Sequence, residues 1–274
     1  MAAVAASNAN SPTSPPAVTA PVRRIGPDDL RAALREGFGD FLAKRGDLVF
    51  IGFVYTLVGL VTAVAALGYP LLAWFFPLAA GLSLLGPLAC TGFYELARRR
   101  EAGLESSWWH FFDIVRHPSR VQIAMVAGVL IGLFIAWVAA AALIYRIFLG
   151  DTPPASLGSF LATLFGTPEG WAMMIVGDLV GLCFAALVLT ISLVSLPMLV
   201  DRRVDGGTAI ATSIRAVRAN PGMTARWGLI VAVLLALGSI PFFLGLAVVL
   251  PVLGYATWHL YTKLVDRTAL PPAH

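Results

Sequence analysis

Long apolar runs alternate with short polar segments along most of this chain, from Leu48 to Tyr261. A helix needs about 20 mostly apolar residues to cross about 30 Å of hydrocarbon. The last run begins at Gly222 and is too long for one crossing, so a tight turn is expected near Pro241. The pattern predicts six membrane-spanning helices, at residues 48–67, 71–93, 121–145, 174–200, 222–240 and 242–261.

Lysine and arginine residues fall almost entirely on one side of these predicted helices. Counted segment by segment along the chain, their numbers are 6, 0, 5, 1, 5, 0 and 2. Short loops rich in lysine and arginine stay in the cytoplasm. Six crossings with both termini in the cytoplasm satisfy this rule, whereas a single crossing after Gly222 would place Lys263 and Arg267 outside. We therefore expect a multi-pass membrane protein.

The amino-acid composition also indicates a membrane protein. Hydrophobic residues make up 58% of the chain and charged residues only 12%, whereas a soluble domain has about 25% charged residues. Residues 1–22 contain no charged side chain and predict a disordered tail. The membrane domain is expected at 23–267 and a C-terminal tail at 268–274. A short helix is expected around Leu157–Phe165, between the third and fourth spans.

Each cytoplasmic segment before an odd-numbered span has apolar residues at helical spacing. These residues are Leu30, Leu34, Phe38, Phe41 and Leu42, then Leu104, Trp108, Phe111, Phe112 and Val115, and finally Ile210, Ile214 and Val217. A short helix with one apolar face and basic flanks is typical of the membrane interface. The predicted fold is an all-α bundle of three helical hairpins, each preceded by a cytoplasmic interfacial helix.

The second and third of these units align at a constant offset. The alignment pairs Arg99-Arg100 with Arg202-Arg203, Gly103 with Gly206, and Pro118 with Pro221. Both prolines are expected in the first turn of the following span, where proline is tolerated. The even-numbered spans also carry an interior proline, at Pro87, Pro197 and Pro251. These correspondences predict a threefold repeat.

Asp178 is the one acidic residue inside a predicted span. An acid within a membrane is by default a functional candidate. The fourth apolar run is longer than a span needs, so Asp178 also fits the headgroup layer, which we favour, or a hydrogen bond between helices. Ser83, Ser192 and Ser195 could line a polar cavity with the carbonyls that the interior prolines free. Prolines that only adjust packing are the commoner case.

The basic and aromatic residues of the cytoplasmic segments are the other candidates. Partner or lipid contacts are predicted at Trp108, Phe111, Phe112, Arg98, Arg99, Arg100, Arg202 and Arg203. The role of arginine in setting topology explains the basic clusters by itself. His259 is interpreted as an interfacial anchor, and the spacing of His110 and His117 is weak evidence for a metal site.

Motifs for known chemistry are missing from the sequence. The chain has no Walker loop, no HExxH and no GxSxG motif, and its two cysteines lie in apolar runs. We therefore expect no catalytic, metal or cofactor site, no enzymatic activity and no nucleic-acid partner. Two small-xxx-small patterns, Gly128/Gly132 and Gly177/Gly181, predict close helix packing. They leave the oligomeric state open.

Several segments resemble a bacterial family of integral membrane proteins, the domain of unknown function 2189 type, which is sometimes mislabelled as cytochrome c oxidase subunit I. The resembling residues are Val22–Ile25, Trp108-Trp109 with Phe111-Phe112, Leu196–Arg202, and Thr208 through Pro221 to Trp227. The resemblance covers roughly residues 21–267. It implies six spans and the bacterial inner (plasma) membrane, and it carries no activity or catalytic residue.

Two functions are consistent with these features. The first is a non-enzymatic scaffold or helper that engages membrane lipid or another inner-membrane complex through its cytoplasmic helices. The alternative is a small transporter or channel that uses the proline-broken spans and Asp178. The first is favoured because the amphipathic segments are the distinctive part of the sequence.

Overall fold

The computed structural model describes residues 20–43, 77–78, 84–151, 154–241 and 243–272. Its helices are α1 (Pro27–Ala43), α4 (Gly86–Ala89), α5 (Thr91–Glu101), η1 (Trp108–Arg116), α6 (Arg120–Leu149), α7 (Leu157–Gly166), α8 (Pro168–Asp201), α9 (Gly206–Ala219), α10 (Pro221–Ser239), α11 (Leu246–Leu264) and η2 (Arg267–Ala269). Within these residues, β structure is limited to two isolated bridges. The predicted all-α class is therefore confirmed.

Three helices, α6, α8 and α10, are long and apolar enough to cross a membrane. They match the spans predicted at 121–145, 174–200 and 222–240. The first predicted span, 48–67, and about half of the second, 71–93, lie outside the described residues, as does the predicted tail up to residue 19. The described part of the chain therefore supplies three apolar spans.

The sixth predicted span, 242–261, corresponds to α11, which is not one of the three apolar spans. The first half of α11 is apolar, but its second half carries Trp258, His259, Thr262 and Lys263. The side chains of this half contact other helices of the protein, and Trp258 is fully buried. Protein contacts therefore stabilise polar groups that lipid would not.

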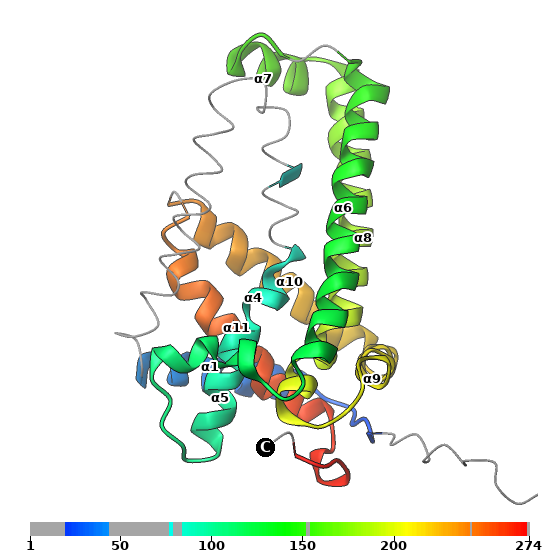
Figure 1. Ribbon diagram of the computed structural model, residues 1–274. Coiled ribbons are helices and arrows are strands. Elements are labelled where there is room, and N and C mark those ends of the chain that lie inside the picture. Colours follow the sequence, from blue (N-terminus) through cyan, green and yellow to red (C-terminus); the bar gives the residue numbers. More distant parts are fainter. Residues whose placement is uncertain (1–19, 44–76, 79–83, 152–153, 242, 273–274) are drawn as a thin grey trace, which may run out of the picture.

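The helices α6 and α8 stand side by side as the tallest part of the molecule, and α7 crosses at their far end (Figure 1). The 30 residues of α6 rise about 45 Å and the 34 residues of α8 about 51 Å. Only 22% of the most apolar stretch of α6 is buried, which suits contact with lipid. The short helix predicted around Leu157–Phe165 is confirmed by α7.

A tryptophan joins α6 to α8. A Cβ added to Gly181 would lie 3.2 Å from the Trp137 ring, so the glycine lets the indole approach the α8 backbone. Trp137 also packs edge-on against Phe184, and its Nε1–H donates to the Pro77 carbonyl at 2.8 Å. Gly128 of the first small-xxx-small pattern meets no described atom within 4 Å.

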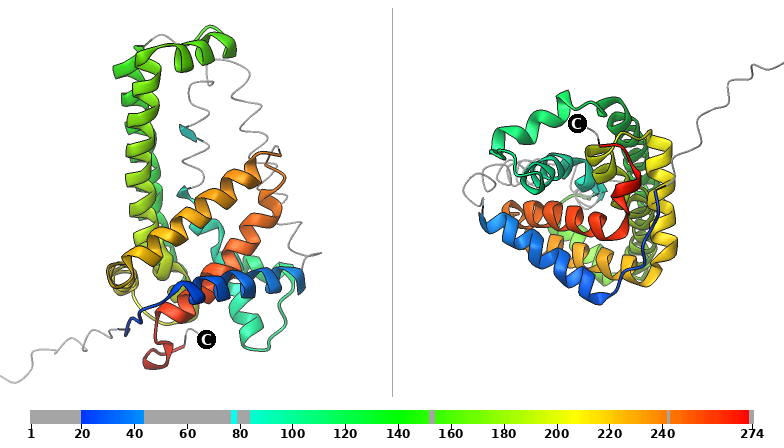
Figure 2. Two further views of the ribbon diagram at one scale, coloured as in Figure 1. Left: turned by 180° about the vertical axis from the view of Figure 1, so that it is seen from behind. Right: turned by 90° about the horizontal axis from the view of Figure 1, so that it is seen from below.

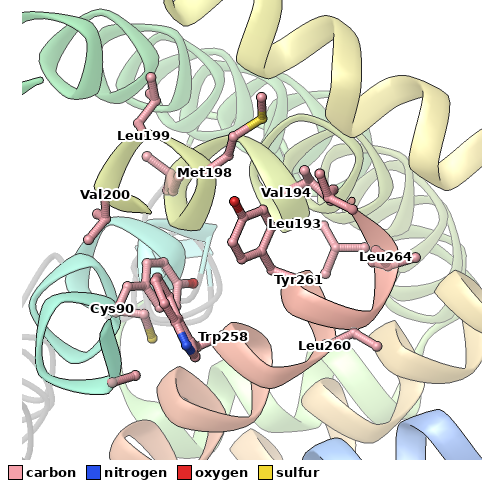
Figure 3. Packing of buried hydrophobic residues seen from close by; sticks show 14 of the residues in the cluster. Cys90, Leu193, Val194, Met198, Leu199, Val200, Trp258, Leu260, Tyr261 and Leu264 are labelled. Carbon is pink, nitrogen blue, oxygen red and sulfur yellow. The ribbon is translucent and has the colours of Figure 1, made fainter. Parts of the chain in front are cut away.

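The buried core lies at one end of the molecule, here called the basal end, which is formed by α1, α5, η1, α9 and the second half of α11 (Figure 2). There the last turns of α8 and α11 pack side by side (Figure 3). The labelled residues of this packing are Leu193, Val194, Met198, Leu199 and Val200 of α8 with Trp258, Leu260, Tyr261 and Leu264 of α11. The apolar helices therefore extend from a common base, which is packed like the core of a soluble protein.

The helix α1 packs mainly against α11. The two backbones approach so closely that a Cβ on Gly37 would lie 2.5 Å from the Ala256 nitrogen. Leu30 and Phe41 are buried in this contact, whereas Phe38 and Leu42 remain 48% and 46% exposed. The predicted helix is confirmed, and its apolar residues divide between the core and the surface.

The segment before α1 is also fixed to the basal end. Val22 forms a bridge with Val265, and the Arg23 N–H donates to the Leu264 carbonyl at 2.8 Å. The Asn220 side chain accepts from the Ile25 N–H and donates to the Arg23 carbonyl. The residues that carried the Val22–Ile25 resemblance therefore tie the N-terminal segment to α10 and α11.

The predicted repeat is only partly visible. A short helix precedes both α6 and α10, but η1 is a 3₁₀ helix whereas α9 is an α-helix. Pro221 stands at the start of α10 as predicted, but Pro118 precedes the first turn of α6, which begins after Ser119. Gly103 has a positive φ of 67°, whereas Gly206 is helical. Different local geometries therefore underlie the matching residues.

The proline prediction needs a similar correction. Pro197 and Pro251 lie inside α8 and α11, as expected. Pro87 instead lies at the start of the four-residue helix α4, where it removes no hydrogen bond from a helix interior. Only two of the three prolines therefore interrupt a described helix.

Candidate functional site at the basal end

The residues of the predicted polar cavity do not come together in the described structure. Asp178 is exposed on α8, and Ser192 lies about 21 Å further along the same helix at 1.5 Å per residue. The hydroxyls of Ser192 and Ser195 are buried and donate to carbonyls of their own helix, at 2.7 and 2.6 Å. Ser83 lies outside the described residues.

Near these serines, a side chain from α9 bonds to two backbone groups of α8. The Ser213 hydroxyl accepts from the Val194 N–H at 3.2 Å and donates to the Thr190 carbonyl at 2.7 Å. These two backbone groups are four residues apart, the spacing of backbone hydrogen bonds in an α-helix. The hydroxyl therefore attaches α9 to α8 while keeping both backbone groups satisfied.

The α9 helix buries small residues rather than the large apolar ones singled out from the sequence. Its buried residues are Gly206, Ala209, Thr212, Ser213 and Ala216. Ile210 and Val217 are only partly buried. A small-residue face allows the close approach that the Ser213 hydroxyl needs.

The 3₁₀ helix η1 has an inner and an outer face. Phe111 points inward and packs edge-on against Phe93 with ring centroids 5.0 Å apart. A Cβ on Gly92 would lie 2.4 Å from the Phe111 ring, so the glycine makes room for it. Trp108 is partly buried against the core and stacks on Trp109. Two of the three predicted aromatic contacts therefore serve packing.

The outer face of η1 exposes large apolar side chains. Trp109 is 65% exposed, Phe112 55% and Val115 71%. We call these three residues the aromatic face. Val121 and Met125, at the start of α6, are also exposed, so apolar surface continues from η1 onto a membrane-spanning helix. Arg116 and Arg120 are exposed beside it.

Arginines predicted as partner or lipid contacts form ion pairs within the protein. Arg98 bonds to Glu95 through two nitrogens, Arg99 reaches Asp113 at 3.4 Å, Arg100 reaches Asp40 at 2.9 Å, and Arg202 reaches Asp201 at 3.0 Å. The Arg203 side chain is exposed, and its backbone N–H donates to the Pro271 carbonyl. Internal ion pairs therefore add a structural role to the topological one.

A junction of charged groups, which the sequence reasoning missed, joins four elements of the basal end. Arg267 of η2 donates to Glu101 of α5 through two nitrogens, one at 3.1 Å, and lies 3.6 Å from Asp201 at the end of α8. The Tyr261 hydroxyl donates to Asp201 at 2.9 Å, and the Trp258 Nε1–H donates to Glu101 at 3.0 Å. We call these five residues the basal junction. An acid beside each arginine cluster was the available signal.

Charge interactions lower the pKa of Glu101. Burial by itself raises this pKa, but the hydrogen bonds and charge of Arg267, the Trp258 hydrogen bond and the charge of His259 outweigh it. Opposite charges also raise the pKa of Arg267 although burial acts to lower it. Both shifts favour the ionised pair that the structure contains.

The lowered pKa of Glu101 predicts a dependence of stability on pH. A depressed carboxyl pKa stabilises the fold above its unfolded value, about 4.5, and this contribution is lost as the pH falls through the folded value. Unfolding in detergent, measured from pH 7 to pH 3, should therefore show a smaller acid-induced loss for Glu101→Gln than for the wild type. Parallel curves for the two proteins would contradict this assignment.

The three histidines that the structure describes occupy separate environments. His110 faces Ser107 within η1. His117 is buried, accepts from the Ser119 N–H at 3.1 Å and lies 3.1 Å from the Val200 carbonyl. His259 lies between two carboxylates of α1. Among the described residues, no group of three or more His, Cys, Asp or Glu side chains is placed to hold a metal ion.

The arrangement of apolar helices on a packed base is that of an integral membrane protein. Residues 75–201 match the model of a family described as predicted integral membrane protein (DUF2189). The resemblance noted from the sequence is therefore confirmed for Trp108–Phe112 and for Leu196–Asp201. Val22–Ile25 and the stretch from Thr208 to Trp227 lie outside the matched residues. Comparison with curated proteins and with solved structures gave no match.

Proposed function

We propose that this protein is a non-enzymatic membrane scaffold or helper that engages lipid or another membrane complex through the aromatic face. In this proposal the chain crosses a bacterial inner membrane six times, with both termini in the cytoplasm. The basal end then lies at the cytoplasmic surface. Supporting this orientation, the paired arginines gather at the basal end, whereas Arg146 lies near the opposite end beside α7.

The exposure of Trp109 and Phe112 is the observation that carries the proposal. Large apolar side chains on a surface mark contact sites when they form a patch. The aromatic face continues onto the outer surface of α6 and has Arg116 and Arg120 beside it. Tryptophan is enriched where membrane meets water, and basic residues there are attracted to anionic headgroups.

The proposal predicts that Trp109→Ala with Phe112→Ala weakens engagement of lipid or partner. Burying an aromatic side chain contributes about 1.5–3 kcal/mol, so the double variant should lower engagement about tenfold or more. In nanodiscs with brominated acyl chains, the Trp109 fluorescence, isolated by comparison with Trp109→Phe, should be strongly quenched if lipid is the contact. Copurification from native membranes would detect a protein contact.

The opposite end of the molecule offers a matched control. Phe165 and Trp171 form an edge-on aromatic pair and are 56% and 52% exposed. Phe165→Ala with Trp171→Ala removes similar apolar area without touching the basal end. Equal behaviour of the two double variants in both assays would refute the role of the aromatic face.

The alternative function, a small transporter or channel, has a separate test. Purified protein in liposomes should then conduct protons or a small solute, and Asp178→Asn should abolish the flux. Asp178 is exposed on α8. This position is compatible with a polar path for a transported solute and with the headgroup layer. Flux that depends on Asp178 would replace the scaffold proposal.

A further inference from the structure

His259 stands where α11 faces α1, and both of its ring nitrogens meet a carboxylate. Its Nε2 lies 2.8 Å from an Asp40 oxygen, and its Nδ1 lies 3.3 Å from a Glu36 oxygen. The imidazole is 23% exposed, so water and protons reach it. The two acids come from successive turns of one face of α1.

A neutral imidazole has one N–H and one lone pair, whereas an imidazolium has two N–H donors. Ionised carboxylates only accept hydrogen bonds. Both contacts of His259 are therefore favourable only when the ring carries two protons. Without the second proton, a nitrogen lone pair faces a carboxylate oxygen, and that contact becomes repulsive.

We propose that His259 is a proton-operated latch that holds α1 against α11. The protonated ring donates to Glu36 and Asp40 together and closes the latch. Deprotonation removes one of these hydrogen bonds and loosens the contact. Histidine is the side chain whose charge ordinarily changes between about pH 5 and pH 8, so a test of the latch compares pH values across this range.

Other charged groups around the ring also pair with the two acids. Lys263 Nζ lies 3.0 Å from Glu36, and Arg100 Nε lies 2.9 Å from Asp40. Glu101 of α5 also interacts with the charge on His259 and is itself paired with Arg267. Because Lys263 of α11 still pairs with Glu36 of α1 when His259 loses a proton, the latch weakens without separating the helices completely.

The latch goes beyond the scaffold proposal and does not depend on it, because it concerns α1 rather than the aromatic face. Opening the latch changes how firmly α1 is held against α11. Phe38 and Leu42 project from α1 at the surface of the basal end, and the first predicted span follows α1 in the chain. Loosening of α1 therefore changes how firmly Phe38 and Leu42 are held and how firmly the chain is fixed before the first predicted span.

Hydrogen exchange of the full-length protein in nanodiscs tests the latch directly. Exchange protection of residues 27–43, corrected for the intrinsic effect of pH on exchange, should fall about two- to tenfold from pH 5.5 to pH 8, as expected for loss of one hydrogen bond. His259→Gln should remove this pH dependence. The control His110→Gln, on η1, should keep the wild-type profile.

A second variant keeps the test decisive if His259→Gln folds poorly. In Glu36→Gln the amide can donate to an unprotonated ring nitrogen, so protection of α1 should become nearly independent of pH. Constant protection of wild-type α1 across this range, or a wild-type profile in Glu36→Gln, would overturn the latch. Neither result bears on the aromatic face.

Discussion

Replacing Asp201 with alanine is expected to destabilise the protein by about 3 kcal/mol, because it removes a buried acid that pairs with two arginines and accepts from a buried tyrosine hydroxyl. The Asp201 side chain is only 9% exposed and faces Arg202, Arg267 and the Tyr261 hydroxyl. The free energy of unfolding in mixed detergent micelles measures this loss. Asp201→Asn, which keeps an acceptor for Tyr261 but removes the charge, should lose less.

An exposed ion pair provides the control for this prediction. Arg146 and Asp151 lie 2.6 Å apart, and their side chains are 66% and 75% exposed. Surface pairs contribute about 0–1 kcal/mol, so Asp151→Ala should change stability little. A similar loss for Asp151→Ala and Asp201→Ala would show that the basal junction contributes no more to stability than an exposed ion pair.

Replacing Gly37 with alanine should separate α1 from α11 and destabilise the protein by about 1–3 kcal/mol, the usual cost of overpacking. The added methyl group would lie 2.5 Å from the backbone nitrogen of Ala256, and a helix backbone cannot rotate aside as a side chain can. Thermal unfolding and hydrogen exchange over residues 27–43 measure the effect.

Gly39, two residues further along α1, is a matched control. It is exposed, and an added Cβ meets no described atom within 4 Å. Alanine is favoured over glycine inside a helix by about 0.5–1 kcal/mol, so Gly39→Ala should be neutral or stabilising. A stabilising effect at both positions would contradict the close crossing of α1 and α11.

The local sequence pattern was sufficient to predict some helices and not others. Apolar runs located α6, α8 and α10 because length and hydrophobicity are properties of a segment by itself. The same reasoning located α1 and α7. The span predicted at 242–261 stays a prediction, because the polar second half of α11 packs against α1 and α5, which are remote in sequence.

The candidate site shows the same division. Sequence periodicity identified the η1 segment and its aromatic residues, but it could not separate the inward Phe111 from the outward Phe112. Their difference depends on Gly92, which leaves space for one ring. The basal junction was missed because Glu101, Asp201 and Arg267 lie far apart in sequence and meet only after three helices pack.

By itself, the sequence determined the membrane character of this protein, its helical class and the positions of the three apolar helices α6, α8 and α10, because these depend on composition and short-range periodicity. Only the tertiary structure decided which arginines are paired, which aromatic side chains remain exposed and where His259 meets its carboxylates. Those properties depend on distances between residues from different helices, and such distances are set by packing rather than by local pattern.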